Sequence, residues 1–546
     1  MIEKILTGDQ AIAQGAIESD VRVVTGYPGS PGTKVLMGIL ELSKDNPECH
    51  VEWSANEKVA FEIALGASIG GDRAMVCLKS VGMNITIDPI MTANLTGVNA
   101  GLVILLGDDP GALLSQNEQD TRLIMDFVEL PLMEPSSSQE AKDMIIKAFE
   151  LSEEFQTIVI VREIRSFSVT KGSVKIEDPI KIDSKGFNRQ KNKWISTTFN
   201  VLENHEKLHN KLGRIEQRFR NSDFNKVTGS NRKYCVIAAG FSYTKLMDIL
   251  KDKTDEIGIL KLGTIYPLPE EIITNFLRFT SEVLVLEDNE PFIENKIKAI
   301  CHDAFIDTEV IGKTTGHIPR VDEVTKDDIA RVLESEFGLT LSAANLSEQR
   351  AISKGELEKT FCDDCPYTPT FEVLSQVIEE LGEKPIIIAE PGCAVRLNAP
   401  PFEMLDVKYS MGSAIGIASG LAWSRTKNKP IAVCGDSSFF HTGINALMNV
   451  VHNRSPIFIM VLDNSVAALT GYQTHPGSGY DIRGKKTTRV DVADIARLCG
   501  IPFVAIVTPD NLDEMKSAFS KALTMDDLSL VVIRKPCPLI EKALPI

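Results

Sequence analysis

The sequence lacks the features of a nucleic-acid-binding or membrane-spanning protein. Its 58 Lys and Arg residues are outnumbered by 75 Asp and Glu residues, and the formal net charge of −17 argues against a basic surface for nucleic acids or anionic lipids. No apolar run reaches the roughly 18 residues that a transmembrane helix requires. The segment Met1–Leu6 has no basic stretch leading into an apolar core and a cleavage site. We therefore expect a cytoplasmic protein that does not insert into membranes.

The chain is too long to fold around a single core. Its 546 residues are 43% hydrophobic and 24% charged, which is typical of a globular protein with several domains. Changes of composition and periodicity predict four parts: 1–165, a polar connector with one helix in 166–230, 231–345 and 346–546. In the first, third and fourth parts, short apolar runs alternate with helical patterns. We therefore predict an α/β fold with parallel sheets covered on both faces.

Polar side chains follow two apolar runs in the last part. Gly435-Asp436-Ser437 comes directly after the run Ile431 to Cys434, and Asn464 lies 28 positions after Asp436, behind a second apolar run. Parallel sheets bind ligands at the carboxyl ends of their strands. Carboxylate and amide oxygens, together with the phosphates of a ligand, suit Mg²⁺. The alternative is an ordinary strand-turn-helix in which Asp436 caps the helix.

Four of the 10 cysteines share a pattern. Cys362 and Cys365 form a C-x-x-C pair, Cys393 follows a predicted strand at 385–389, and Cys537 follows the last predicted strand at 529–533. Cys393 and Cys537 thus follow strand ends of one sheet, and four thiolates, two of them paired by C-x-x-C, suit a [4Fe–4S] cluster. A structural zinc site and inert buried thiols are the alternatives. We expect the other six cysteines to be core residues or free thiols: Cys49, Cys77, Cys235, Cys301, Cys434 and Cys499.

Taken together, these segments resemble the large (α) subunits of indolepyruvate:ferredoxin oxidoreductases, in the 2-oxoacid:ferredoxin oxidoreductase superfamily. The resemblance extends over nearly the whole chain and is carried by runs at 25–31, 52–60, 107–111, 115–122, 134–137, 435–443, 462–464 and 470–479. It implies two doubly wound parallel-sheet domains that bind thiamine diphosphate (ThDP), of the pyrimidine-binding type in 1–165 and the diphosphate-binding type in 346–546. It also implies a transketolase C-terminal-like α/β domain in 231–345.

The resemblance also assigns roles to residues. Glu57, at the start of an Ala- and Gly-rich helix, would activate the cofactor through a ring nitrogen; the alternative is a helix N-terminal glutamate that favours the macrodipole. Asp436, Asn464 and the carbonyl of Val466 would bind Mg²⁺. His441 and His475 are candidate proton shuttles, with packing or capping as the alternative. The expected cofactor-binding residues are Tyr27, Pro28, Gly29, Ser30, Glu57, Gly412, Gly435, Asp436, Ser437, Asn464, Val466, Leu469 and Thr470.

The implied reaction is oxidative decarboxylation of a 2-oxo acid to its acyl-CoA through the ThDP C2 carbanion, with electrons leaving through the [4Fe–4S] cluster. Ser30, Lys79 and Asn84 are candidates to bind the substrate carboxylate. Family members often have Gln where this chain has Ser80 and His where it has Tyr472, which favours a broader class of aryl- or branched-chain 2-oxo acids. The alternatives are a non-oxidative ThDP lyase or decarboxylase and a catalytically inactive scaffold.

Family α subunits usually continue into a ferredoxin-like domain. The present sequence ends at Ile546 without a C-x-x-C-x-x-C-x-x-x-C-P run. We therefore expect electrons to pass to ferredoxin, a similar carrier or a partner subunit. The resemblance further implies a smaller β subunit and a homodimer of this chain within a heterotetramer.

Overall fold

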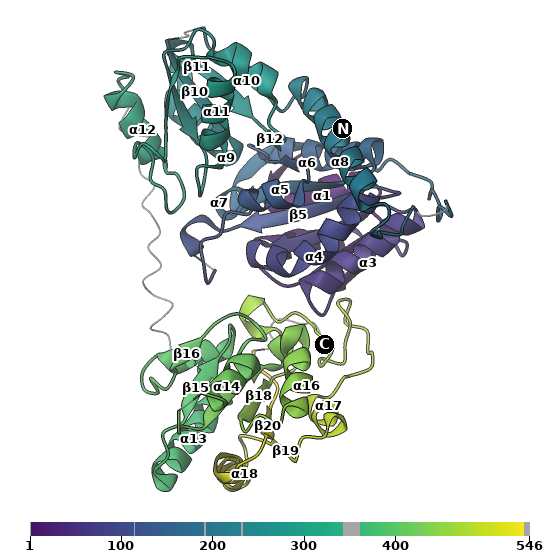
Figure 1. The fold of residues 1–546 in the computed structure, drawn as a ribbon, viewed down its shortest axis with the longest axis vertical. Coiled ribbons are helices and arrows are strands. Elements are labelled where there is room, and N and C mark those ends of the chain that lie inside the picture. The colour runs from purple at the N-terminus through teal and green to yellow at the C-terminus, as the bar shows by residue number, and fades with distance from the viewer. Residues whose placement is uncertain are drawn as a thin grey trace. The chain divides into compact units, whose positions relative to one another are not determined.

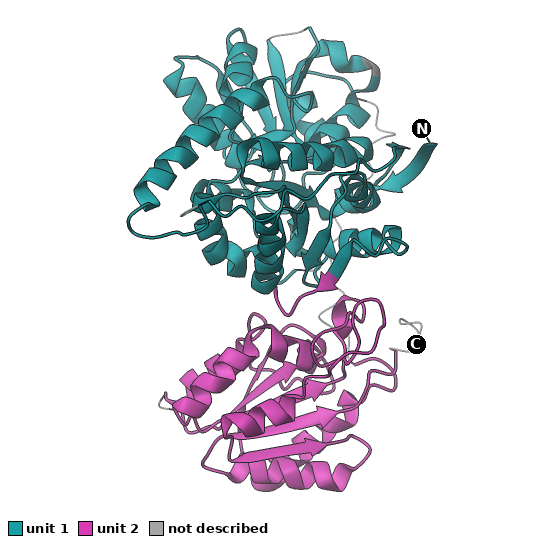
Figure 2. Ribbon diagram, turned by 90° about the vertical axis from the view of Figure 1, so that its right-hand side faces the viewer, with its two compact units in different colours: residues 1–51, 57–352 teal, residues 52–56, 353–546 magenta. Residues whose placement is uncertain are grey.

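The computed structural model describes residues 2–113, 115–190, 193–230, 233–341, 361–424 and 426–539. The chain divides into two compact units, which are treated separately: unit 1 comprises 1–51 and 57–352, and unit 2 comprises 52–56 and 353–546 (Figure 2). The expected domain boundaries at 230/231 and 345/346 fall on residues outside the described ranges. None of the described helices is both long and apolar enough to cross a membrane.

Unit 1 is built around a seven-stranded sheet in the order β12-β6-β7-β5-β4-β2-β3 (Figure 1). Its central strands pair in parallel, and every residue of β4 and β5 is buried, as expected for a sheet covered on both faces. The strands are β2 (Val23–Gly26), β3 (His50–Trp53), β4 (Ala74–Lys79), β5 (Leu102–Asp108), β6 (Leu132–Met133), β7 (Ile158–Ile164) and β12 (Thr264–Tyr266).

The helices of this sheet fall into two contacting groups. Helices α1, α2 and α6 pack together, and α3 packs with α4. Their bounds are α1 (Gly8–Glu18), α2 (Gly32–Leu42), α3 (Glu57–Gly70), α4 (Ser80–Thr96), α5 (Arg122–Val128), α6 (Ser138–Phe155) and α7 (Arg165–Val169). Two further strands, β1 (Ile2–Thr7) and β8 (Lys171–Ile176), form an antiparallel pair. Strand β8 comes from the segment expected to be a connector.

A second sheet in unit 1 has the order β14-β13-β10-β11-β9, parallel except for β9. Its strands are β9 (Lys226–Thr228), β10 (Tyr234–Ala239), β11 (Gly258–Leu262), β13 (Glu282–Leu286) and β14 (Glu309–Ile311). The helices of this region are α8 (Val201–Arg220), α9 (Gly240–Leu250), α10 (Glu270–Leu277), α11 (Phe292–Asp303) and α12 (Lys326–Ser335).

Unit 2 holds a six-stranded, all-parallel sheet in the order β16-β15-β17-β18-β20-β19. Its strands are β15 (Ile386–Ala389), β16 (Val407–Lys408), β17 (Pro430–Gly435), β18 (Phe458–Asp463), β19 (Phe503–Val507) and β20 (Ser529–Arg534). Its helices are α13 (Tyr367–Leu381), α14 (Ala414–Ala422), α15 (Asp436–Ser438), α16 (Ile444–His452), α17 (Val492–Cys499) and α18 (Leu512–Thr524). The predicted α/β class with doubly wound parallel sheets is confirmed.

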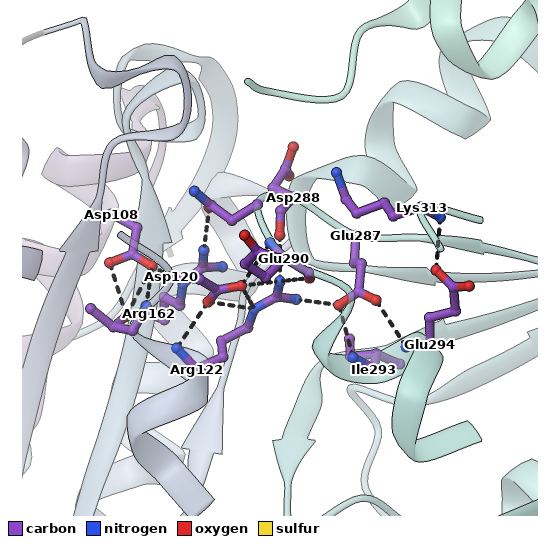
Figure 3. A network of polar contacts seen from close by, with 12 residues as sticks. Asp108, Asp120, Arg122, Arg162, Glu287, Asp288, Glu290, Ile293, Glu294 and Lys313 are labelled. Atoms are coloured by element: carbon purple, nitrogen blue, oxygen red, sulfur yellow. Dashed lines mark hydrogen bonds and ion pairs between the residues drawn. The ribbon is translucent and has the colours of Figure 1, made fainter. Parts of the chain in front are cut away.

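A network of buried charges ties the two sheets of unit 1 together (Figure 3). Arg162, on β7, donates from Nε to Asp108 Oδ2 (2.7 Å), from Nη1 to Glu134 Oε1 (2.7 Å) and from Nη2 to Asn289 Oδ1 (2.9 Å). Arg122 Nη1 donates to Glu287 Oε2 (2.8 Å). Glu287 directly follows β13 of the second sheet. Both guanidinium groups are buried, so each carboxylate depends on its arginine for compensation.

We expect Arg162→Met to destabilise unit 1 by about 3–5 kcal/mol, because it leaves Asp108 and Glu134 buried without their cation. Arg320→Met is the matched control, since Arg320 forms an exposed pair with Glu290 (2.9 Å), worth at most about 1 kcal/mol. Urea unfolding followed by circular dichroism measures both. Equal shifts of the urea midpoint for the two variants would contradict the role assigned to Arg162.

Candidate active site

The strand register of unit 2 brings its polar residues to one edge of the sheet. Ala389 pairs with Val433, Gly435 with Leu462, and Asp463 with Arg534. Parallel strands point their carboxyl ends the same way, so the residues that follow each strand converge. Glu390, Asp436, Asn464 and Cys537 all lie in these post-strand segments.

Asp436 is buried at the start of α15, and protein groups fix both of its carboxylate oxygens. Oδ1 accepts from the backbone N–H of Ser437 (2.8 Å), and Oδ2 accepts from the backbone N–H of Ser465 (2.7 Å). His475 Nε2 lies 3.3 Å from Oδ2. The carboxylate therefore has a defined orientation at the end of β17, with lone pairs left for a cation.

His475 has a defined tautomer in its neutral form. Its Nδ1 accepts the backbone N–H of Gly477 (3.1 Å), so the ring proton resides on Nε2, the atom that faces Asp436. The imidazole ring of His475 packs against the ring of Phe440, with 5.6 Å between the two ring centroids. His475 Nε2 thus lies close to Asp436 but forms no hydrogen bond within the described residues, and a role in proton transfer stays a prediction.

Asn464 and Val466 form a tight turn after β18. Asn464 is buried, and its Oδ1 accepts the backbone N–H of Val466 (3.1 Å). Its backbone carbonyl accepts the N–H of Cys537 at 3.4 Å. The amide oxygen keeps a second lone pair, so it could still serve as a ligand.

Glu390 is a site residue that the sequence reasoning missed. It follows β15 and is 1% exposed. Its carboxylate accepts hydrogen bonds from the Ser438 hydroxyl and from the Ala414 N–H (2.7 Å). Burial raises the pKa of Glu390. Because Ser438 also accepts the Gly412 N–H (3.1 Å), Glu390 ties the loop before α14 to the Asp436 turn. The position of Glu390 directly after a predicted strand is the sequence feature that could have identified it as a site residue.

The remaining predicted cofactor residues of unit 2 surround this turn. Gly412 has φ +75°, and a Cβ there would lie 1.8 Å from Thr442 Oγ1, so only glycine fits. His441 is buried in a π-helical turn, Phe439–Gly443, with Nδ1 at 3.2 Å from Thr442 Oγ1. Thr470 Oγ1 contacts Gln473 Oε1 at 2.6 Å, and Leu469 is exposed.

The four predicted cluster cysteines line one cavity of about 220 Å³ in unit 2. Asn464 lines the same cavity. Further lining residues are Phe361, Pro366, Tyr367, Arg396, Ala468, Leu469, Tyr472, Pro538 and Leu539. Among the described residues, the buried Tyr367 hydroxyl has no hydrogen-bond partner. A buried, unpaired hydroxyl beside four sulfurs suggests a missing acceptor.

The cavity disfavours free thiolates. Burial, followed by the neighbouring Cys365 and Cys537, raises the pKa of Cys393 to about 12. Burial also raises the pKa of Cys365 and of Cys537. These thiols are therefore neutral at pH 7 in the metal-free protein, and a bound cationic centre would stabilise their thiolates. The other six cysteines do not line this cavity.

Glu57 begins α3 in unit 1 and is buried. Space for its side chain depends on Gly82 of α4, because a Cβ at position 82 would lie 2.5 Å from Glu57 Cγ and 2.7 Å from Oε1. By contrast, a Cβ at Gly66, further along α3, would meet nothing within 4 Å. The glycine at position 82 therefore shapes the pocket around the Glu57 carboxyl group.

The predicted turn after β2 packs against the end of β4. A Cβ at Gly29 would lie 2.8 Å from Lys79 Cβ, and the Gly29 N–H donates to Thr33 Oγ1 (2.7 Å). Tyr27 is buried, as is Lys79, whose pKa is lowered by burial. Asn84 instead exchanges hydrogen bonds with Gln119 (2.8 and 3.0 Å). Unit 1 thus holds Glu57 and the turn, and unit 2 holds Asp436, Asn464 and the cysteines.

Comparison with known proteins agrees with this geometry. A family model described as "Thiamine pyrophosphate enzyme, C-terminal TPP binding domain" matches residues 392–533. A second, "Pyruvate flavodoxin/ferredoxin oxidoreductase, thiamine diP-bdg", matches residues 14–195. The two matches cover the elements that carry Asp436 and Glu57, respectively.

Relatives match over almost the whole chain. The indolepyruvate oxidoreductase subunit IorA of Archaeoglobus fulgidus is 35% identical, over 98% of this chain and 87% of its own length. The subunits of the same name from Pyrococcus abyssi and Methanothermobacter thermautotrophicus are 36% and 33% identical over 98% of this chain, and 86% and 87% of their own lengths. The chain therefore belongs to the family of indolepyruvate oxidoreductase IorA subunits, the ThDP-dependent catalytic α subunits of 2-oxoacid oxidoreductases.

Proposed function

We propose that this subunit oxidatively decarboxylates aryl 2-oxo acids, indolepyruvate among them, to acyl-CoA and passes the electrons through a [4Fe–4S] cluster held by Cys362, Cys365, Cys393 and Cys537. The observation that carries the proposal is the cavity that these four cysteines share with Asn464. An electron acceptor in this cavity would lie directly beside a residue of the diphosphate motif.

Asp436 and Asn464 are the proposed Mg²⁺ ligands, with the carbonyl of Val466 as a third. Their oxygens match the hard-donor preference of Mg²⁺, which keeps its remaining positions for water and phosphate oxygens. Two backbone N–H groups hold the Asp436 carboxylate ready for the ion, as partners of metal ligands commonly do.

Glu57 is proposed to hold and move the proton that activates the cofactor. When bound, ThDP supplies a carbanion that attacks the 2-oxo carbon and takes up the electrons left by decarboxylation. For this role Glu57 must present its carboxyl group to a ring nitrogen in a site that excludes water. Its burial and the fitted space at Gly82 support the assignment.

The spacing of the sulfurs favours a cluster over zinc. In the described part of the chain, one group of three or more His, Cys, Asp or Glu side chains has all its ligand atoms within 4.8 Å of one another, and it contains no cysteine. A tetrahedral zinc ion with Zn–S bonds of about 2.3 Å would hold the sulfurs within about 4 Å. In a [4Fe–4S] cluster each thiolate binds its own iron, so wider spacing suits it.

The substrate class rests on the names of the relatives and on the turn after β2. The buried side chain of Lys79, whose alkyl part lies beside Gly29, would bind the substrate carboxylate together with Ser30. Coenzyme A would capture the acyl group, and ferredoxin or a smaller β subunit would accept the electrons. The proposed assembly pairs two copies of this chain with two β subunits.

Replacing Gly82 by Ala is expected to lower kcat at least about 100-fold, because the added methyl group displaces the Glu57 carboxyl from its position. Gly66→Ala is the matched helix control and should retain activity, since its methyl group meets nothing within 4 Å. Glu57→Gln should be inactive. Reduction of a viologen dye with indolepyruvate and CoA measures all three. Full activity in Glu57→Gln would remove the proposed mechanism.

Asp436→Asn should weaken Mg²⁺-dependent ThDP binding by at least about 10-fold, because an amide replaces the charged ligand of a hard cation. Isothermal titration of ThDP at several Mg²⁺ concentrations measures this loss. The exposed Asp494→Asn serves as the control and should bind as the wild type does. Unchanged binding in Asp436→Asn would place the ion elsewhere.

Protein purified without oxygen should contain about four iron and four sulfide per chain and lose its brown colour on reduction with dithionite. Cys393→Ser should lose the cluster, whereas Cys499→Ser should keep it, because Cys499 lies outside the cavity. Zinc in place of iron would refute the cluster. Release of CO₂ and an aldehyde without any electron acceptor would instead favour the non-oxidative decarboxylase.

A further inference from the structure

Helix α8 in unit 1 carries two imidazoles on one face. His205 and His209 are four residues apart, which places them one above the other on a helix. The run His205-Glu206-Lys207-Leu208-His209 has the H-E-x-x-H spacing of helical zinc sites. Leu208, Ile215 and Phe219 are the buried residues of the helix. The two imidazoles are left accessible, with side chains 47% and 59% exposed.

A carboxylate from another element meets both rings. His205 Nε2 lies 3.0 Å from Glu129 Oε2, and His209 Nε2 lies 2.7 Å from Glu129 Oε1. The two rings are 4.4 Å apart between centroids. Each of the three side chains offers a ligand atom, and these atoms all lie within 4.8 Å of one another. Two nitrogens and a carboxylate oxygen thus converge on one point.

The backbone fixes Glu129 in this position. It ends α5 in the left-handed conformation, with φ +54°. Its N–H donates to the Met125 carbonyl (2.9 Å), and its carbonyl accepts from Nδ2 of the buried Asn94 (3.1 Å). Because two hydrogen bonds define this backbone, the carboxylate is presented to α8 at little further cost in entropy.

We propose that Glu129, His205 and His209 bind a divalent transition-metal ion of the zinc class, through Nε2 of both imidazoles and one carboxylate oxygen. Zinc takes such ligands at about 2.0–2.2 Å, and the three ligand atoms, which lie within 4.8 Å of one another, can all reach one ion. A fourth position stays open to water. Imidazole and carboxylate suit Zn²⁺ and its neighbours, whereas Mg²⁺ and Ca²⁺ prefer oxygen ligands alone.

The assigned role is to clamp α8 to the end of α5, both within unit 1. Glu206 of the H-E-x-x-H run is exposed. The cavity of about 530 Å³ that borders α8 is lined by Asn204, Lys207 and Lys211 from a different side of the helix, and by none of the three ligands. Because none of the three ligands lines this cavity, hydrolysis is not part of the proposal.

The test is a calorimetric titration of the cluster-containing protein with Zn²⁺. The cluster occupies the four thiolates, and Mg²⁺, present throughout, occupies the proposed oxygen ligands. We expect one additional equivalent of Zn²⁺ per chain and a higher midpoint of thermal unfolding. His205→Gln/His209→Gln should weaken this binding at least about 100-fold. Glu129→Gln should weaken it by at least about 10-fold.

His302→Gln is the matched control, since His302 is an exposed histidine that also pairs with a carboxylate, Asp303 (3.1 Å); it should bind as the wild type does. Bound Co²⁺ should give the visible bands of nitrogen and oxygen ligands, without the intense near-ultraviolet absorption of thiolate ligands. Equal Zn²⁺ binding by the wild type and the double variant, equal losses in His302→Gln, or a thiolate spectrum would each overturn the proposal. The histidines would then only form ion pairs with Glu129.

Discussion

The active-site residues of unit 2 depend on the parallel pairing of β15, β17, β18 and β20. The register sets Ala389, Gly435 and Asp463 at the strand ends, so the next residues leave the sheet at one edge. Two backbone hydrogen bonds extend this order past the strands: Ser465 N–H to Asp436 Oδ2 (2.7 Å) and Cys537 N–H to the Asn464 carbonyl (3.4 Å). A slip in register would separate the proposed oxygen ligands from the cysteines.

Three neighbouring buried carboxylates at this edge are distinguished by their partners. Asp463 accepts from Arg534 Nε (2.7 Å) and Arg489 Nη2 (2.9 Å) and so serves the fold. Glu390 is bound by a hydroxyl and a backbone N–H, and burial raises its pKa. Asp436 accepts two backbone N–H groups and keeps further lone pairs for the proposed cation. The environment, and not the residue type, separates structural from ligand-binding acids.

Local sequence patterns predicted the strands and the residues that follow them. The run Ile431 to Cys434 is β17, and the run before Asn464 is β18, because buried parallel strands are continuous apolar segments. Cys393 and Cys537 follow strand ends of one sheet, and they line one cavity together with the Cys362 and Cys365 pair. Parallel strands share an edge, which explains this proximity, and the cluster itself stays a prediction.

Contacts between distant segments left no such signal. The pairing of β8 with β1, the addition of β12 to the first sheet and the fit of Gly82 against Glu57 each depend on how finished elements pack. Glu390 had a positional signal, but nothing local indicated that Ser438 and Ala414 would bind it. In the sequence, Arg122 and Arg162 look like ordinary surface charges. Their burial and their hydrogen bonds to Glu287 and Asn289 become visible only in the structure.

Ligand chemistry gives each proposed metal its own place in this chain. Oxygen donors at Asp436 and Asn464 suit a hard ion that must also bind phosphate. The cysteines of the adjacent cavity suit iron when they are deprotonated. Burial raises the pKa of their thiols, which therefore stay protonated until a cationic centre enters. Imidazoles on α8, in unit 1, suit a borderline ion. Zinc also accepts thiolate ligands, so the cysteine cavity can bind Zn²⁺ unless iron occupies it, whereas the oxygen donors alone favour Mg²⁺.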